Sequence, residues 1–310
     1  MRVFVAGATG AIGRPLVSQL LEAGHEVVGM TRSEERATEL REAGAEAAVC
    51  DAHDSEAVRA AVTGARPEVL VHQLTDLPQD FNPRYDYGET NELRTRVTRD
   101  LIEAAREGGA GRIVAQGVAF FYLPTGSMVK DEDAPVVSSE VADGKQAEAG
   151  DALVDLERQV LGAEGMDGLV LRYGFFYGPG TWFSADSNLA TTYRRRMSPI
   201  VGSGEGVFSF IHVHDAASAT VAAVERGAPG VYNVVDDDPA PANDWMPAFA
   251  EAVGGKPPRR MPVWIGKAVG GQNAEALETM RGATNAKARR ELGWKPRYSS
   301  WRQGFKEGIR

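Results

Sequence analysis

The chain has 310 residues, of which 43% are hydrophobic and 25% charged, and its formal net charge is −9. These values are typical of a globular protein with one large α/β domain, or a large domain with a smaller lobe. The negative charge argues against nucleic acid or an anionic membrane as the main partner, because both bind basic surfaces.

Cysteine content and apolar patterning narrow the class of protein further. Cys50 is the only cysteine, so the chain forms no internal disulfide, which fits a reducing compartment. No apolar run reaches the roughly 18 residues of a membrane span, and the opening residues MRVFVAG are too short an apolar stretch for a signal peptide. We expect a cytoplasmic enzyme or binding protein that acts without nucleic acid and without a membrane.

Strands and helices alternate through the first half of the chain. Short apolar runs ended by glycine or polar residues predict strands, and apolar residues on one helical face predict helices between them. The predicted strands cover residues 2–7, 25–32, 45–51, 68–75, 111–118 and 167–178, and the helices cover 11–24, 35–44, 54–65, 91–109 and 151–165. This order implies a parallel sheet covered by helices on both faces.

The second half is less regular. Strands at 206–213 and 230–236 flank a helix at 215–227, with loop-rich stretches around them. The fold class that we expect is α/β, a Rossmann-like doubly wound parallel sheet with a smaller C-terminal substrate lobe. We place a dinucleotide-binding domain at residues 1–172 and a mixed region, with the late sheet strands and the small lobe, at 173–310.

The stretch AGATGAIGRP carries three glycines at every third position, Gly7, Gly10 and Gly13. Between a predicted strand and a predicted helix, this spacing is typical of a nucleotide-binding loop. Gly7 would end the strand, Gly10 would let the backbone approach a pyrophosphate, and Gly13 would let the helix pack closely.

The end of the second strand selects between the two nicotinamide dinucleotides. An acidic residue there would hold a ribose 2′-hydroxyl, whereas an arginine accommodates a 2′-phosphate. The sequence GMTRSEER places Thr31, Arg32 and Ser33 at this point, with no acid before Glu34. We predict NADP(H) as the cofactor. The alternative is that Arg32 is an ordinary surface residue and that either dinucleotide binds.

At this point the chain resembles the extended short-chain dehydrogenase/reductase superfamily, in particular its epimerase/dehydratase-like branch. The resemblance covers nearly the whole length. It rests on Asn91 and on the stretches GATGAIG, VLVHQLT, LRYGFFYGPG, FIHVHDAA, GVYNVVD and ATNAKARRELGWKPRYSSWRQGF. It implies a homodimer through the helices at 91–105 and 151–161, and a C-terminal lobe that closes over the substrate.

The resemblance also implies a set of contacts to the dinucleotide. Asp51 and Ala52 would lie beside the adenine, and Tyr173 and Gly174 would approach the nicotinamide. The residues expected to bind the cofactor are Gly7, Thr9, Gly10, Ala11, Ile12, Gly13, Thr31, Arg32, Ser33, Asp51, Ala52, Gln73, Leu74, Thr75, Tyr173 and Gly174.

The Ser-Tyr-Lys catalytic set of this superfamily is missing from the matching positions. Counted back from Glu157, Ala149 and Leu153 stand at the tyrosine and lysine positions, and Gly117 and Val118 stand where a hydroxyl residue belongs. No tyrosine occurs between residues 122 and 173, so a shifted alignment does not restore the set. The usual proton donor is therefore absent.

Two tyrosines are candidates to act in its place, and three aromatic residues are candidates to bind the substrate. Tyr122 is either a substitute acid or a packed aromatic side chain, and Tyr173 either titrates or lines the nicotinamide pocket. Phe175, Trp182 and Phe183 form either an apolar substrate wall or the core between the two lobes.

The histidines give weak metal signals. His212 and His214 would share one face if the strand continued that far, but no third ligand stands at a recognisable spacing. We interpret His72 as a core histidine and Asp215 as a helix cap, and we expect no metal.

The sequence favours an NADP(H)-dependent oxidoreductase with an atypical proton donor that acts on a small, hydrophobic molecule. A redox-neutral isomerase, epimerase or cyclase on the same fold is the first alternative. A non-catalytic NADP-binding sensor is the second.

Overall fold

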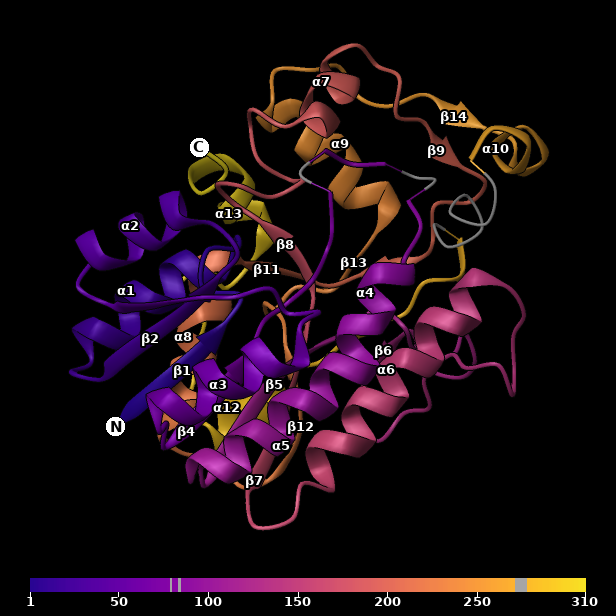
Figure 1. Ribbon diagram of the computed structural model, residues 1–310. Coiled ribbons are helices and arrows are strands. Elements are labelled where there is room, and N and C mark those ends of the chain that lie inside the picture. The colour runs from indigo at the N-terminus through magenta and orange to yellow at the C-terminus, as the bar shows by residue number, and fades with distance from the viewer. Residues whose placement is uncertain (79, 83–84, 271–277) are drawn as a thin grey trace.

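The computed structural model describes residues 1–310 except 79, 83–84 and 271–277 (Figure 1). A seven-stranded sheet lies at its centre, and all neighbouring strands in it are parallel. In spatial order the strands are β12 (Gly230–Val234), β7 (Asp167–Tyr173), β5 (Arg112–Val118), β4 (Val69–His72), β1 (Arg2–Ala6), β2 (Glu26–Thr31) and β3 (Glu46–Val49). The fold class predicted from the sequence is confirmed.

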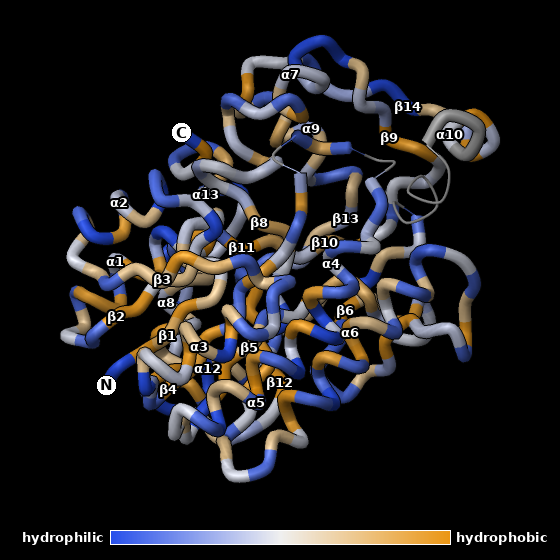
Figure 2. Tube along the Cα trace, viewed as in Figure 1, coloured by the Kyte–Doolittle hydropathy of each residue, from blue (hydrophilic) through white to orange (hydrophobic). Residues whose placement is uncertain are grey.

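Helices cover both faces of the sheet with separate apolar cores. The core of one face includes residues of α1 (Gly13–Glu22), α2 (Glu34–Glu42), α8 (Val213–Glu225) and α12 (Ala286–Glu291). The core of the other face includes residues of α3 (Ser55–Ala65), α5 (Thr98–Gly108) and α6 (Lys145–Leu161). Leu16, Leu20 and Leu101 are fully buried, and each such side chain stabilises the fold by roughly 1.5–3 kcal/mol. Figure 2 shows hydrophobic residues concentrated along the central strands.

The predicted helix over 91–109 is interrupted. It consists of α4 (Gly88–Glu92), the π-helical turn η1 (Leu93–Val97) and α5. Within it, the Thr98 hydroxyl donates to the carbonyl of Leu93, five residues earlier, at 3.1 Å. Single π-helical turns inside longer helices occur frequently at functional sites.

A smaller lobe lies beyond the carboxyl ends of the strands (Figure 1). Its core is rich in aromatic residues, among them Phe183, Phe210, Trp245, Phe249 and Phe305. The short elements outside the sheet and its covering helices are β6 (Val129–Lys130), β8 (Phe175–Tyr177), α7 (Asn188–Arg194), β9 (Ile200–Val201), β10 (Val207–Phe208), β11 (Phe210–His212), β13 (Ala240–Pro241), α9 (Ala242–Ala252), β14 (Arg260–Met261), α10 (Val263–Gly270), β15 (Gly282–Ala283) and α13 (Trp301–Glu307).

Two strand predictions were too long. The strand over 167–178 divides at Gly174 into β7 and β8, because β8 leaves the sheet to pair with β11. A Cβ at Gly174 would lie 2.6 Å from the carbonyl oxygen of Ser209, so only glycine fits this crossing. The strand over 206–213 divides into β10 and β11 in the same way, because β10 pairs with β13 instead.

The prediction that Asp215 caps a helix was wrong. His212 is the N-cap of α8, and its Nδ1 accepts a hydrogen bond from the backbone N–H of His214 at 3.1 Å. Asp215 lies inside the helix, where its carboxylate accepts from the backbone N–H groups of Arg297 and Tyr298. Because the helix starts at Val213, His212 and His214 do not share a strand face.

Candidate functional site

The strand order reverses between β1 and β4, which is where ligands bind in doubly wound sheets. Gly7 ends β1 with a φ of +91°, and a Cβ there would lie 2.8 Å from the carbonyl carbon and oxygen of Gln73. The backbone N–H of Gln73 donates to the carbonyl of Ala6 at 2.8 Å. Glycine is therefore needed at position 7 for the two strands to end side by side.

Gly10 and Gly13 have different surroundings. A Cβ at Gly13 would lie 2.2 Å from the carbonyl oxygen of Gly7, whereas one at Gly10 would meet its nearest atom at 3.4 Å. The lack of a side chain at Gly13 therefore allows α1 to start in close contact with the loop. The lack of one at Gly10 leaves open space beside the backbone. No side chain caps the start of α1. The backbone N–H of Arg14 donates to the carbonyl of Gly10 at 3.1 Å and Pro15 has no N–H, so these two positions of the first turn offer no free donor to an anion.

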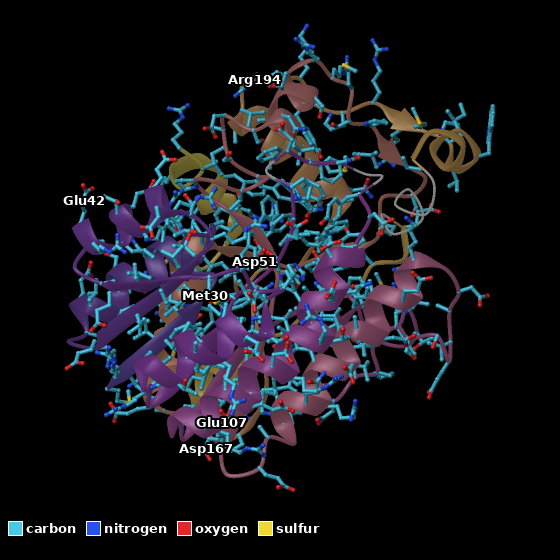
Figure 3. The ribbon with its side chains drawn as sticks, in the orientation of Figure 1. Met30, Glu42, Asp51, Glu107, Asp167 and Arg194 are labelled. Atoms are coloured by element: carbon cyan, nitrogen blue, oxygen red, sulfur yellow. The ribbon has the colours of Figure 1, made fainter. Side chains whose placement is uncertain are left out.

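A pocket opens at this switch point. Figure 3 shows Met30 and Asp51 at the edge of the sheet that faces the smaller lobe, and Glu107 and Asp167 at the opposite end. Residues that line the pocket and had been predicted to bind the cofactor are Gly7, Thr9, Gly10, Thr31, Arg32, Asp51, Ala52, Gln73, Leu74 and Thr75. Residues that line it but were not predicted are Met30, Arg36, Cys50, His53, Asp76 and Leu93.

Six other residues of the predicted set do not line this pocket: Ala11, Ile12, Gly13, Ser33, Tyr173 and Gly174. Ser33 is the N-cap of α2, and its hydroxyl accepts from the backbone N–H of Arg36. A second depression, lined by residues that include Glu68, Gly111 and Arg112, lies at the amino ends of the strands, away from the switch point.

Two arginines bring positive charge to the pocket. Arg32 follows β2 and Arg36 lies in the first turn of α2, and both are exposed. Among the residues that the structure describes, neither guanidinium forms an ion pair. The nearby Arg14 differs, because it pairs with Glu39 at 3.0 Å. Two unpaired guanidinium groups on one pocket wall fit a phosphate.

Tyr173 lies behind the pocket and orients Gln73. The Gln73 amide nitrogen donates to the Tyr173 hydroxyl at 3.1 Å, and this hydroxyl is 2.6 Å from that of Thr220. Because the Thr220 hydroxyl donates to the carbonyl of Ala216, the Tyr173 proton goes to Thr220. Burial raises the pKa of Tyr173 to about 12. Gln73 Oε1 is buried and has no hydrogen-bond partner in the described part of the chain, which makes it an acceptor for a bound ligand.

Tyr122 belongs to a buried polar network on the other side of β7. Its hydroxyl donates to Asn233 Oδ1 at 2.6 Å and accepts from Arg172 Nη1 at 3.1 Å. Arg172 also donates through Nε and Nη2 to the two carboxylate oxygens of Glu157, at 2.6 and 2.7 Å. Burial raises the pKa of Tyr122. In this arrangement the phenol proton is directed to Asn233 and not to the pocket.

Ala149 and Leu153, at the positions matched to tyrosine and lysine, are both buried on α6. Their apolar side chains provide no proton donor. A catalytic role for Tyr122 or Tyr173 stays a prediction. The hydroxyl groups of both residues form hydrogen bonds to other protein groups, as expected of residues that stabilise the fold.

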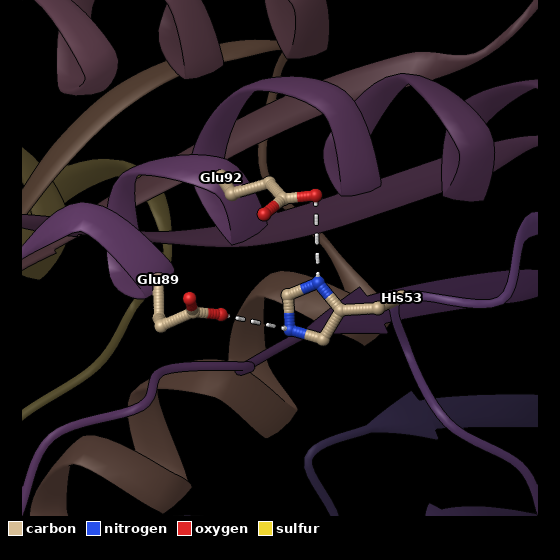
Figure 4. A group of neighbouring side chains, drawn as sticks. All are labelled: His53, Glu89 and Glu92. Carbon is tan, nitrogen blue, oxygen red and sulfur yellow. Dashed lines mark ion pairs between the residues drawn. The ribbon is translucent and has the colours of Figure 1, made fainter.

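His53, Glu89 and Glu92 form a charged cluster beside the pocket (Figure 4). The His53 ring nitrogens lie 3.7 Å from Glu89 and 3.5 Å from Glu92. Arg96 donates to Glu92 at 2.7 Å and stands 3.4 Å from His53, which lowers the pKa of Glu92. Because this guanidinium already pairs with Glu92 Oε1, the oxygen that faces His53, we do not assign the cluster to a metal ion.

The aromatic residues of the predicted substrate wall separate into two environments. Phe175 stacks on Phe120, with ring centroids 4.2 Å apart and an interplanar angle of 18°. Trp182 donates from Nε1 to the carbonyl of Pro78 and meets the edge of Phe81. Phe183 is buried in the core of the smaller lobe. Phe120 and Phe175 follow β5 and β7 on the edge of the sheet where the pocket opens, but they are not among the residues that line it.

His72, at the end of β4, is held as a core histidine. Its Nε2 lies 3.1 Å from the Thr98 hydroxyl, its Nδ1 accepts from the backbone N–H of Leu74, and burial lowers its pKa to about 4. Both ring nitrogens are therefore engaged within the protein.

The fold and the pocket define a Rossmann-type protein with a glycine loop at the switch point of its sheet. The chain belongs to the NAD dependent epimerase/dehydratase family, whose model matches residues 3–234. The sequence-based recognition of this branch is confirmed.

Three known proteins are similar to this chain, one in sequence and two in fold. A Streptomyces protein named 3-diazoavenalumate denitrifying reductase is 46% identical over 308 residues, which cover 98% of this chain and 99% of the relative. UDP-glucose 4-epimerase of Thermotoga maritima, solved with UDP-glucose, has a TM-score of 0.77 at 21% identity, covering 100% and 97% of the two chains. A human epimerase family protein, solved with NADPH, has a TM-score of 0.72 at 22% identity, covering 100% and 99%.

These comparisons support an enzyme of the oxidoreductase type. The description of the family agrees with a nicotinamide dinucleotide as the cofactor, which is also what Gln73 Oε1, the open face at Gly10 and the two arginines fit. Within the described part of the chain, no helix is long and apolar enough to cross a membrane.

Proposed function

We propose that this protein is an NADPH-dependent reductase that replaces the diazo group of a small aromatic molecule with hydrogen. The main support is the relative at 46% identity, whose name specifies a diazo substrate, loss of nitrogen and reduction. The site adds a second argument. Both tyrosines predicted as proton donors direct their hydroxyl protons to other protein groups.

The proposed reaction balances without a proton from the protein. When bound, the reduced nicotinamide supplies a hydride. Transfer of this hydride to R–N₂⁺ forms R–H and releases N₂, as the carbon–nitrogen bond breaks and its electron pair leaves with the nitrogen. Reduction of a carbonyl would instead create an alkoxide that needs an acid nearby. A site without a directed phenol therefore suits a diazonium substrate better than a ketone.

The chain's own residues would bind and orient the reactants. The glycine loop, with its open face at Gly10, would hold the pyrophosphate, and Gln73 Oε1 would accept from the ligand. The stacked pair of Phe120 and Phe175 provides an aromatic surface for the ring of the substrate. Holding the two reactants in contact supplies much of the catalysis in such a reaction.

The test is turnover of 3-diazo-4-hydroxybenzoate with NADPH. We expect one N₂ released for each NADPH oxidised, and deuterium from 4-deuterated NADPH on the ring carbon that lost nitrogen. The variants Tyr122→Phe and Tyr173→Phe should keep kcat within about threefold, since loss of a true general acid lowers rates by about 10²–10⁴-fold.

Other outcomes would favour the alternatives. Product formation at constant NADPH would support a redox-neutral isomerase, epimerase or cyclase. Tight NADPH binding without turnover of diazo, carbonyl or alkene compounds would support a sensor. A hundredfold loss of kcat in either tyrosine variant would return that tyrosine to the role of proton donor.

The preference for NADPH over NADH is a further part of the proposal. Arg32→Ala and Arg36→Ala should each weaken NADPH binding about tenfold, or about 1.4 kcal/mol, with little change for NADH. Arg14→Ala is the matched control, because Arg14 pairs with Glu39 outside the pocket. Titration of each variant with both dinucleotides measures the effect. Equal losses for NADPH and NADH would show that the arginines do not read the 2′-phosphate.

A cytoplasmic location, a homodimer and the lack of a nucleic-acid partner stay predictions from the sequence. The proposed dimer helices correspond to η1, α5 and α6 in the structure. Val154 and Leu161 of α6 are exposed apolar residues that such an interface would cover.

A further inference from the structure

A buried arginine without an acceptor lies beside the dinucleotide pocket. Arg94, in the π-helical turn η1, is 6% exposed, and its Nη1 is fully buried without a hydrogen-bond partner. The guanidinium donates no hydrogen bond and forms no ion pair within the described residues. Buried charges are normally paired, because removal of a guanidinium from water without a partner is strongly unfavourable.

The neighbours of Arg94 place it between the pocket and the smaller lobe. Leu93, which precedes it, lines the pocket, and Thr90, one turn earlier, accepts from the backbone N–H of Asp76 in the pocket wall. Tyr85, which lies near Arg94, donates its hydroxyl to Asp76. Figure 1 shows α4 directly below the smaller lobe.

The segment after β4 connects the pocket to that lobe. Pro78 accepts from the indole of Trp182, and the backbone N–H of Phe81 donates to Asn188 at 2.9 Å. A substrate held between the pocket and the lobe would therefore lie within reach of η1.

We propose that Arg94 binds the carboxylate of the substrate, and that the substrate is an aromatic diazo acid. This inference rests on the proposed function. A guanidinium matches a carboxylate with two parallel hydrogen bonds, and Arg94 Nη1 has no acceptor among the described residues. The substrate in the name of the Streptomyces relative is itself a carboxylate.

The charge state of Arg94 agrees with this role. Burial lowers the pKa of its guanidinium to about 10, which leaves the group protonated at neutral pH. The positive charge of Arg94 also contributes, together with burial of the imidazole, to the lowered pKa of His72. Arg94 is therefore the cation that an acidic substrate would meet at this place.

The experiment measures binding to the enzyme loaded with NADP⁺, so that it does not depend on turnover. The probes are 4-hydroxybenzoate and 4-hydroxycinnamate, each compared with its methyl ester by calorimetric titration. We expect the wild type to bind at least one acid about tenfold or more tightly than its ester. Arg94→Gln should remove this preference, and Arg94→Lys should restore part of it.

Arg99→Gln is the matched control, because Arg99 is an exposed arginine on the adjoining helix α5. It should keep the full preference for the acid. NADPH affinity without a probe should be unchanged in Arg94→Gln, and a tenfold loss there would assign Arg94 to the dinucleotide and overturn the proposal. Equal binding of acid and ester by the wild type, or binding of neither, would overturn it as well.

The same variants separate this inference from the proposed function. Reduction of 3-diazo-4-hydroxybenzoate and of its methyl ester at the same kcat/KM, unaffected by Arg94→Gln, would refute the carboxylate site and keep the reductase. A preference for acids that depends on Arg94, without reduction of either diazo compound, would refute the reductase and keep an acid-binding site.

Discussion

Replacement of Glu157 by leucine is expected to lower the free energy of unfolding by about 3–5 kcal/mol. Glu157 and Arg172 are 13% and 6% exposed, and they pair through two short hydrogen bonds. Without Glu157, the Arg172 guanidinium stays buried beside Tyr122 and the backbone carbonyl of Glu132, with no carboxylate hydrogen-bonded to it. Denaturant unfolding of the apoprotein measures the effect.

An exposed pair with the same geometry is the control. Arg2 donates to both carboxylate oxygens of Glu46 at 2.8 Å, but the Glu46 side chain is 64% exposed. Glu46→Leu should cost less than about 1 kcal/mol, because water solvates the freed guanidinium. The double variant Glu157→Leu, Arg172→Met should recover much of the loss by removing both charges. Equal losses in the two single variants would contradict the role of burial.

The hydrogen-bond network around Arg172 and Tyr122 also shows why the role of Tyr122 was hard to predict. Tyr122 follows β5, where a substitute acid was expected, and the sequence gives no sign that Arg172 and Asn233 would meet its hydroxyl. These partners lie 50 and 111 residues away along the chain. Local patterning places an element, but it does not reveal which distant polar group satisfies a buried hydroxyl.

The parts of the site that follow from short-range pattern were predicted best. The glycine loop, the end of β2 and the polar run after β4 all line the pocket, because the carboxyl ends of parallel strands converge on one edge. Ser33 and Arg36 show the limit of this reasoning. The hydroxyl of Ser33 was assigned to the cofactor but caps α2, and the arginine one turn later lines the pocket.

Arg94 was not among the residues predicted for the site. In the sequence NELRTRVTRD it is one of three arginines, at positions 94, 96 and 99. In a regular helix, position 94 lies on the apolar face of Leu93, Val97 and Leu101, whereas positions 96 and 99 lie on the opposite side. Helical periodicity therefore agrees with the burial of Arg94 and the exposure of Arg99. What the pattern does not reveal is that no carboxylate of the described residues pairs with the buried guanidinium.

Gly13→Ala is expected to weaken NADPH binding about a hundredfold, or about 2.7 kcal/mol, and to lower the melting temperature of the apoprotein by several degrees. The added Cβ would lie 2.2 Å from the carbonyl oxygen of Gly7 and 2.6 Å from the backbone of Ala8. Because these neighbours are backbone atoms, no rotamer change relieves the overlap. The loop and the start of α1 must move apart, and the backbone that would hold the pyrophosphate moves with them.

Gly10→Ala separates the shape of the loop from its contact with the ligand. Its Cβ would meet no atom closer than 3.4 Å, so the fold should tolerate it and the apoprotein should melt within about 2 °C of the wild type. Gly10 lines the pocket, however, and the new methyl group should weaken NADPH binding about tenfold. Thermal unfolding without cofactor and NADPH titration distinguish the two variants. If Gly13→Ala melts and binds like the wild type, the close approach of α1 to Gly7 is not what shapes the pocket.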